Sequence, residues 1–275
     1  MSALPRLAGF AAALAALFGA GALVGAVSGA SAPGGETAQA HGEGAMAMAA
    51  PVRGLSVAAD GVRLVVEDPD LRRGAAEEVR FRIVDGAGRA VRDFDVEHTK
   101  RMHLIVARRD LTGFQHLHPR MDSDGTWVAP LRLREAGAYR LFADFSRSET
   151  PTTLAADLRV DGAADLRPLP APATLAAAGG YEIRLAAGSS RPGREAELRF
   201  TITRDGRPVR TEPYLGAGGH LVALRDGDLA FLHVHPTDGL GFETTFPTAG
   251  TYRLFLQFKH AGQVRTAAFT REVGS

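Results

Sequence analysis

The sequence predicts an all-β protein: two tandem immunoglobulin-like, Greek-key β-sandwich domains that follow an N-terminal apolar helix. Three observations lead to this prediction. Apolar and polar residues alternate in short runs, as in residues 79–84 and 198–203, which is typical of half-buried strands. Turn signals such as Asp85-Gly86 and Asp205-Gly206 separate these runs. The same pattern occurs twice along the chain, so we expect a duplicated domain.

The duplication is visible in five segments that recur in the same order. A period of about 115 residues indicates duplicated domains rather than a solenoid of small units. The matching pairs are residues 79–84 with 198–203, 88–92 with 206–210, 103–104 with 220–221, 116–119 with 233–236, and 136–142 with 249–255.

Each repeat also contains a tyrosine in a characteristic setting. Tyr139 follows Glu135-Ala136-Gly137, and Tyr252 follows Thr248-Ala249-Gly250. Both resemble the tyrosine corner of immunoglobulin-like folds, in which the phenol hydroxyl bonds to the backbone a few residues upstream. This likeness concerns architecture and implies no antibody-like role.

The N-terminal residues differ from the rest of the chain. Arg6 precedes a run without charges from residue 7 to 27, and small residues follow at 30–32. This pattern is typical of a secretory signal. The run of about 20 residues is also long enough to cross a bilayer. We therefore expect residues 1–32 to be either a cleaved signal peptide or a membrane anchor, which places the remainder outside the cytoplasm.

The expected domain boundaries follow from composition. Residues 33–52 are rich in Gly, Ala and Pro and read as a flexible linker. His41, Met46 and Met48 lie in this linker, and imidazole and thioether groups both suit copper. Repeat one is expected at residues 53–162 and repeat two at 175–275. A stiff Pro-rich linker, residues 163–174, joins them.

The overall composition excludes several functions. The formal net charge of +1 gives no reason to expect a nucleic-acid partner. The chain contains no cysteine, so disulfides, thiol catalysis and cysteine-ligated zinc are excluded. We find no phosphate-binding loop and no nucleophile motif. An enzyme is therefore not predicted, although a three-histidine metal site can in principle activate water.

The motif H-x12-H-x-H-P occurs once in each repeat. It comprises His103, His116 and His118 in repeat one, and His220, His233 and His235 in repeat two. Each motif reads as a hairpin of two strands. In repeat two, Asp226-Gly227 suggests a two-residue turn that pairs His220 with His233, whereas a four-residue loop pairs His220 with His235. Side chains alternate with period two, so either register places all three histidines on one face.

Three imidazoles at this spacing are expected to converge on a metal ion. Such a set suits copper, with zinc as the alternative. His98, Met102 and Asp144 are further candidate ligands in repeat one. Repeat two has Gly219 in place of Met102 and Gln257 in place of Asp144. The site of repeat one is therefore expected to bind metal more tightly.

The segments 98–106 and 114–119, together with 214–221 and 233–236, resemble a group of exported bacterial β-sandwich proteins near the YtkA-like and FixH-like families. The resemblance covers most of residues 55–273. It implies a β-sandwich fold and, loosely, a role in handling copper or other heavy metals. The second copy lacks counterparts of His98 and Met102, so the resemblance does not imply equal metal binding by both repeats.

Two functions remain open from the sequence. The first is an extracytoplasmic metal-binding protein, secreted or tethered to the cell membrane, that acts in metal resistance or delivery. The second is a metal-free immunoglobulin-like structural or interaction module of the cell envelope, in which the histidines only support the hairpin. A face-to-face arrangement of the two copies would let them share a site.

Overall fold

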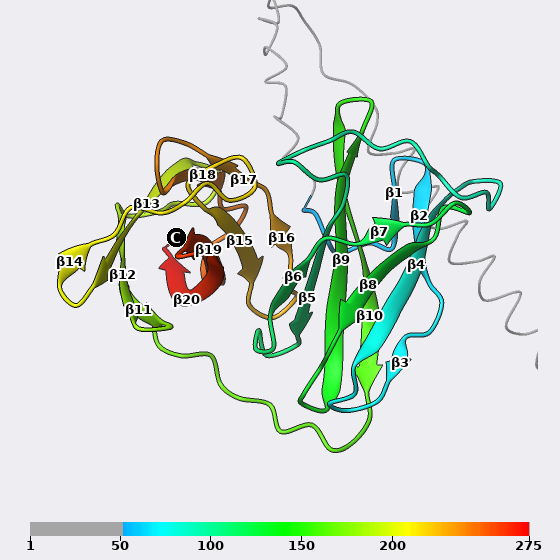
Figure 1. Ribbon diagram of the computed structural model, residues 1–275, viewed down its shortest axis with the longest axis horizontal. Coiled ribbons are helices and arrows are strands. Elements are labelled where there is room, and N and C mark those ends of the chain that lie inside the picture. The colour runs from blue at the N-terminus through cyan, green and yellow to red at the C-terminus, as the bar shows by residue number, and fades with distance from the viewer. Residues whose placement is uncertain (1–51, 275) are drawn as a thin grey trace, which may run out of the picture. The chain divides into compact units, whose positions relative to one another are not determined.

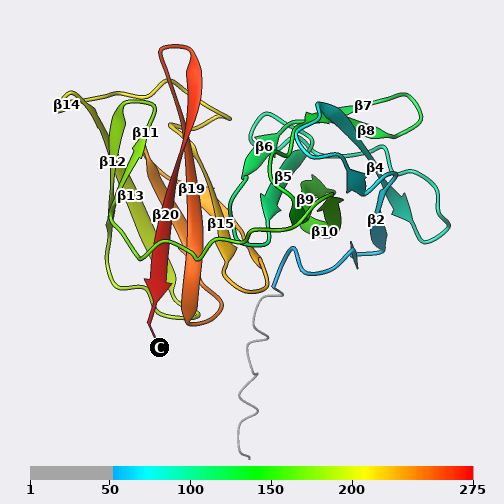
Figure 2. The ribbon, with the colours of Figure 1, turned by 90° about the horizontal axis from the view of Figure 1, so that it is seen from below.

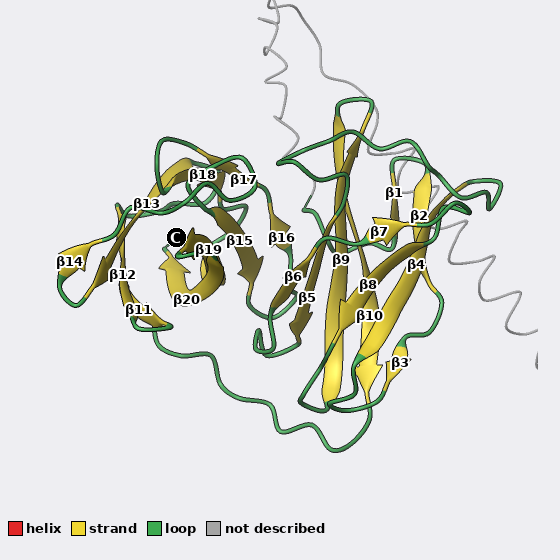
Figure 3. Cartoon of the chain, viewed as in Figure 1, coloured by secondary structure: helices red, strands yellow, loops and turns green. Residues whose placement is uncertain are grey.

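The structure is a computed structural model that describes residues 52–274 of the chain (Figure 1). These residues form strands joined by turns and loops, with no helix among them (Figure 3). The described part of the chain thus has no helix suited to crossing a membrane. The apolar segment 1–32 and the residues His41, Met46 and Met48 lie outside the described residues.

Repeat one is a sandwich of two five-stranded sheets, which confirms the predicted fold class. The first sheet has the order β1-β2-β4-β8-β7, and the second has the order β3-β10-β9-β5-β6. The strands are β1 (Ala58–Ala59), β2 (Val62–Val66), β3 (Asp70–Leu71), β4 (Glu77–Asp85), β5 (His103–Arg108), β6 (Gln115–Leu117), β7 (Arg120–Met121), β8 (Trp127–Leu131), β9 (Gly137–Arg147) and β10 (Thr150–Val160).

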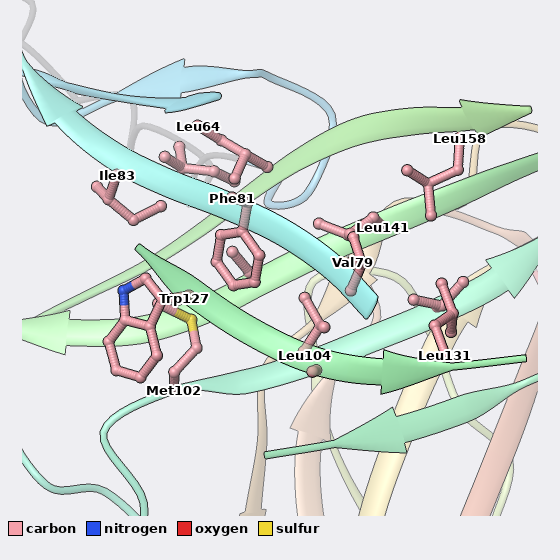
Figure 4. Packing of buried hydrophobic residues seen from close by; sticks show 14 of the residues in the cluster. Leu64, Val79, Phe81, Ile83, Met102, Leu104, Trp127, Leu131, Leu141 and Leu158 are labelled. Atoms are coloured by element: carbon pink, nitrogen blue, oxygen red, sulfur yellow. The ribbon is translucent and has the colours of Figure 1, made fainter. Parts of the chain in front are cut away.

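Alternation along the strands produces the core of this sandwich. In β4, Val79, Phe81 and Ile83 point inward and are almost fully buried. They meet Leu104 of β5 and Trp127 of β8 between the two sheets (Figure 4). Residues of β5 on the other side of the strand therefore face away from this core.

Repeat two has the same architecture and is also a sandwich of two sheets (Figure 2). One sheet has the order β11-β12-β13-β18-β17, with β14 paired to β13, and the other has the order β16-β15-β19-β20. The strands are β11 (Leu175–Ala178), β12 (Tyr181–Ala187), β13 (Glu195–Arg204), β14 (Arg207–Pro208), β15 (His220–Arg225), β16 (Phe231–Leu232), β17 (Val234–Pro236), β18 (Gly241–Thr245), β19 (Gly250–His260) and β20 (Gln263–Val273).

The two tyrosine corners are present. The Tyr139 hydroxyl donates to the Glu135 carbonyl oxygen at 2.8 Å, and the Tyr252 hydroxyl donates to that of Thr248 at 2.9 Å. Each bond closes the loop that leads into the long strand β9 or β19. These strands lie beside β5 and β15, which carry the first histidine of each motif.

A third hydrophobic cluster lies between the repeats. The described residues belong to one compact unit, Met48–Ser275. Within it, the outer faces of β5 and β15 pack against each other, because their alternate residues are apolar on both sides. The cluster includes Ile105, Ala107 and Phe142 of repeat one with Val222, Leu224 and Phe255 of repeat two. The first histidine of each motif lies on this same face of its strand, so the histidines are brought to the interface.

Candidate metal centre

The hairpin of β5 and β6 places three histidines of repeat one on one face. Ile105 lies opposite His116 in the register, and the same register places His103 opposite His118. Directly opposed residues share a face, and their Cβ atoms are about 5 Å apart. The parity argument from the sequence therefore holds in repeat one. We call His103, His116 and His118 the His triad.

The His triad has the geometry of a site that could hold a metal ion. One ring nitrogen of each histidine lies within 4.8 Å of the other two. His103 Nδ1 and His116 Nε2 are only 3.0 Å apart. Two nitrogens at this distance can bind one ion, because zinc–imidazole bonds are about 2.0–2.1 Å long.

The tautomers of two triad histidines follow from their other contacts. His103 Nε2 lies 3.2 Å from the Glu97 carbonyl oxygen, to which it must donate its proton. His116 Nδ1 lies 2.6 Å from Gln257 Oε1, to which it also donates. A neutral imidazole carries one ring proton, so His103 Nδ1 and His116 Nε2 face each other as two lone pairs. His118 Nε2 is also buried and has no hydrogen-bond partner among residues 52–274.

Burial keeps the triad neutral. His103 is only 4% exposed. Loss of hydration on burial lowers the pKa of His103 and of His118 to about 4, and that of His116 to about 3. Neighbouring histidines lower the pKa of His103 and His116 further. Neutral imidazole is the form that binds metals, so the three nitrogens are available as ligands at neutral pH.

Two more histidines join the triad, one of them from repeat two. The rings of His103 and His220 are stacked, with centroids 5.4 Å apart and planes 6° apart. The His220 ring also lies 4.7 Å from that of His116 and 5.8 Å from that of His98. Burial, followed by these neighbours, lowers the pKa of His220 well below its usual value. The cluster of histidines is thus shared between the repeats. A shared site of this kind is one of the arrangements that the sequence left open.

His98 reaches the cluster from a tight turn. Glu97 and Lys100 form two backbone hydrogen bonds with each other, and His98 and Thr99 both have positive φ, 46° and 69°. This is the pattern of a type I′ turn, which usually takes Asn or Gly at these positions. Left-handed backbone is costly for a β-branched residue such as Thr99. The turn holds the His98 ring 6.1 Å from that of His103.

The sequence also matches a family model twice. The model is described as a domain of unknown function, DUF8832, and it matches residues 56–162 and 176–275. The chain belongs to the DUF8832 family. The two DUF8832 domains of this chain coincide with the two sandwiches described above. No curated protein matches the sequence.

The solved structures that match this DUF8832 protein resemble it only distantly. One is FdeC, an Escherichia coli adhesin, with 16% identity, a TM-score of 0.29, and coverage of 80% of this chain and 66% of that chain. A Salmonella alpha-2-macroglobulin has 14% identity and a TM-score of 0.29, covering 81% of this chain and 15% of that chain. The titin domains Z1Z2 in complex with telethonin show 14% identity and a TM-score of 0.20, with coverage of 76% and 94%.

The second DUF8832 domain does not assemble the same triad. Ala223 lies opposite Leu232, and the Arg225 N–H donates to the Ala230 carbonyl oxygen at 3.0 Å. The loop is therefore the four-residue one, and the two-residue turn at Asp226-Gly227 was the wrong alternative. Asp228 Oδ1 accepts the Ala230 N–H at 3.0 Å and stabilises this longer loop.

The strand that should carry the last two histidines of repeat two leaves the sheet early. β16 ends at Leu232, and β17 pairs with β18 of the opposite sheet, where His235 lies across from Glu243. The His233 and His235 rings stay close, with centroids 4.5 Å apart, and His235 is exposed. We call His233 and His235 the second histidine pair. His220 packs against the first site instead, so the two motifs form unequal arrangements.

The other two candidate ligands of repeat one, Met102 and Asp144, are close to His103 in the sequence or in the register, but their side chains make other contacts. Met102 is 1% exposed and belongs to the core of the first sandwich, beside Trp127 (Figure 4). It precedes His103 directly, so alternation turns it to the opposite face of the sheet. Asp144 lies opposite His103 in the register but accepts a hydrogen bond from the Thr153 hydroxyl at 2.6 Å. Burial raises the pKa of Asp144 to about 6.

Proposed function

We propose that this protein is an extracytoplasmic metal-binding protein that holds one ion, preferably copper, at the His triad. The observation that carries the proposal is the pair of facing nitrogens, His103 Nδ1 and His116 Nε2. Their ring protons are committed elsewhere, and burial disfavours a second proton on either ring. A bound cation is what removes the repulsion between two lone pairs held 3.0 Å apart.

Copper is preferred on chemical grounds. The triad offers three neutral nitrogens and no carboxylate. Along the series of divalent ions from Mn²⁺ to Zn²⁺, the affinity of such ligands rises up to Cu²⁺ and is lower again for Zn²⁺. Imidazole ligands also suit zinc, so zinc is the competing ion. The apolar N-terminal segment and the resemblance to exported YtkA-like and FixH-like proteins support a place outside the cytoplasm and a role in metal resistance or delivery.

Metal titration of the full chain tests the proposal. Cu(II), Cu(I) under reducing conditions and Zn(II) should each be titrated into the metal-free protein. We expect tight binding, strongest for copper, that is lost when all three triad histidines are replaced by alanine. His260→Ala is the control, because His260 bonds to Tyr181 in repeat two and takes no part in the cluster. Equal binding by wild type and the triple variant would rule the proposal out.

A metal-free structural or interaction module is the second candidate. It is favoured by the packing of the same rings across the interface, where His103 stacks on His220 and His116 bonds to Gln257. In this case replacing the triad lowers thermal stability, but no metal raises the stability of the wild type. Metal-dependent stabilisation of the wild type alone separates the two candidates, because a ligand that binds only the folded state raises its stability.

A further inference from the structure

The two repeats contact each other through equivalent residues. Phe114 of repeat one stacks on Phe255 of repeat two, with centroids 4.0 Å apart. The corresponding residues, Phe231 and Phe142, form the reciprocal contact at 5.6 Å. A contact in which each side presents the same patch resembles the interface of a two-fold dimer. His103 and His220, which also correspond, stack at the centre of this interface.

An interface of this kind generates two equivalent places, one on each side of the centre. The first holds the His triad together with Gln257 of repeat two. The second must lie beside the corresponding residues, His233 and His235 of repeat two and Asp144 of repeat one. This follows because His116 corresponds to His233, and Gln257 occupies the same register position as Asp144.

The segment 53–55, which leads into the first strand of repeat one, lies at the second place. The Phe231 N–H donates to the Arg53 carbonyl oxygen at 3.0 Å, so Arg53 extends the edge of β16. Gly54 packs closely against Phe231 and Phe142 of the interface. A Cβ atom on Gly54 would lie 2.8 Å from Phe231 Cβ and 2.9 Å from the Phe142 ring. The Arg140 guanidinium donates to the carbonyl oxygen of Leu55 at 2.8 Å and fixes the segment further.

The Arg53 side chain brings a positive charge to this place. After burial, the Arg53 guanidinium is the next cause that lowers the pKa of His233 to about 4. The same guanidinium opposes the burial that raises the pKa of Asp144. Arg53 Nη1 is buried and has no hydrogen-bond partner among residues 52–274. No corresponding segment pairs with β6 in repeat one, where the described contacts of that strand are with β5.

We propose that the Arg53 guanidinium fills the second place, next to His233, and so limits each chain to one metal ion. A permanent cation there excludes another cation by charge and by volume. The inference rests on the proposed metal site of repeat one, which would stay open. Of the two copies of the motif, one then forms a metal site, and in the other the Arg53 guanidinium occupies the place of the ion.

The test counts bound ions in full-length chains. Wild type, Arg53→Gln and Arg53→Lys are titrated separately with Zn(II) and Cu(II) by calorimetry, and bound metal is checked by elemental analysis. We expect one ion for wild type and for Arg53→Lys, which keeps the charge. Arg53→Gln should bind a second ion, and adding His233→Ala and His235→Ala to it should remove that second ion alone.

The outcomes separate this inference from the proposed function. No binding by wild type refutes the metal site itself. One ion in both wild type and a folded Arg53→Gln, or two ions in wild type, overturns the role of Arg53 and leaves the first site standing. Should Arg53→Gln fail to fold, wild type with His233→Ala and His235→Ala decides instead. That variant is expected to keep its one ion at unchanged affinity, and a loss of affinity contradicts the inference.

Discussion

The two repeats share a fold, a motif and a hairpin register, yet they differ in what their histidines contact. In repeat one, β6 continues to Leu117 and its histidines stay on the face of β5. In repeat two, β16 ends after two residues, and β17 crosses to the other sheet. His220 packs against the His triad of repeat one instead. Recurrence of a motif therefore does not ensure recurrence of a site, because in repeat two the strand that carries the last two histidines leaves the sheet earlier than in repeat one.

The comparison also shows that each repeat supplies different parts of one centre. Repeat one provides the triad, and repeat two provides His220 and the acceptor Gln257. Gln257 is itself held by a hydrogen bond from its Nε2 to Thr266 Oγ1 at 3.3 Å. Repeat two thus acts on the candidate site as a cover and a support, whereas its own second histidine pair lies apart from the triad.

The largest expected difference between the repeats is at the corresponding histidines His116 and His233. We expect His116→Ala to lower copper affinity by more than ~100-fold, since the loss of a ligand exceeds the effect of losing a supporting residue. His233→Ala should leave the affinity unchanged. Competition titration with a copper chelator measures both variants under the same conditions. Equal losses in the two variants would show that both motifs bind metal and that the two repeats do not differ in this function.

A smaller effect is expected at the matched pair Gln257 and Asp144. Gln257→Leu removes the acceptor that orients His116, and losses of about 10–100-fold in metal affinity are usual for such supporting residues. Gln257→Glu keeps an acceptor and should retain binding. Asp144→Asn should have little effect, because the Asp144 carboxylate bonds to Thr153. The affinities of the three variants for Zn(II) provide the measurement, with metal-free melting curves as the control for folding.

Much of this arrangement could be predicted from the sequence. Alternation with period two places three histidines on one face whatever the register, so the triad of repeat one followed from parity alone. The same rule excludes Met102, which adjoins His103 and must point into the core. Applying alternation to the apolar neighbours would also have shown that the histidine face is covered, because Ile105 and Val222 lie on it.

The rest depends on contacts that a single sequence does not specify. The break between β16 and β17 arises where the chain changes sheets, and no proline or glycine marks it within residues 231–235. The partnership of His116 with Gln257 joins residues 141 positions apart and requires the docked repeats. The turn at His98 and Thr99 was missed because type I′ turns are recognised by Asn or Gly, and neither is present there.

The stability of the folded chain should depend on pH, because burial holds the histidines of the shared cluster in the neutral form. In the folded chain the pKa is about 4 for His103 and about 3 for His116, against about 6.5 for histidine in an unfolded chain. Between pH 6.5 and about 4 the unfolded chain therefore binds protons that the folded chain does not. The metal-free protein should melt at a lower temperature at pH 5 than at pH 7.

The matched variant for this experiment is His116→Leu, which removes one of the shifted groups. Its melting temperature should fall less steeply between pH 7 and pH 5 than that of the wild type, whatever its stability at pH 7. Calorimetric melting of both proteins at several pH values gives the two slopes. A wild-type slope of zero in this range would mean that the cluster is not buried in the neutral form.

The smallest expected effect concerns the two corresponding turns at the interface. Leu215 and Gly216 have positive φ, 54° and 83°, and form the counterpart of the turn at His98 and Thr99. A left-handed conformation costs a non-glycine residue about 1–2 kcal/mol. Thr99→Gly should therefore stabilise the metal-free protein by about 1 kcal/mol, whereas Gly216→Thr should destabilise it by a similar amount.

The swap isolates backbone strain, because neither change creates a steric clash. A Cβ atom on Gly216 would meet Thr99 Cγ2 at 3.8 Å, which is an ordinary contact. Denaturant unfolding of the metal-free variants gives the two free energies of unfolding. If Thr99→Gly gains stability but loses metal affinity, the strained turn serves to hold His98 at the site. If the affinity stays unchanged, the strain at Thr99 has no part in holding His98 near the site.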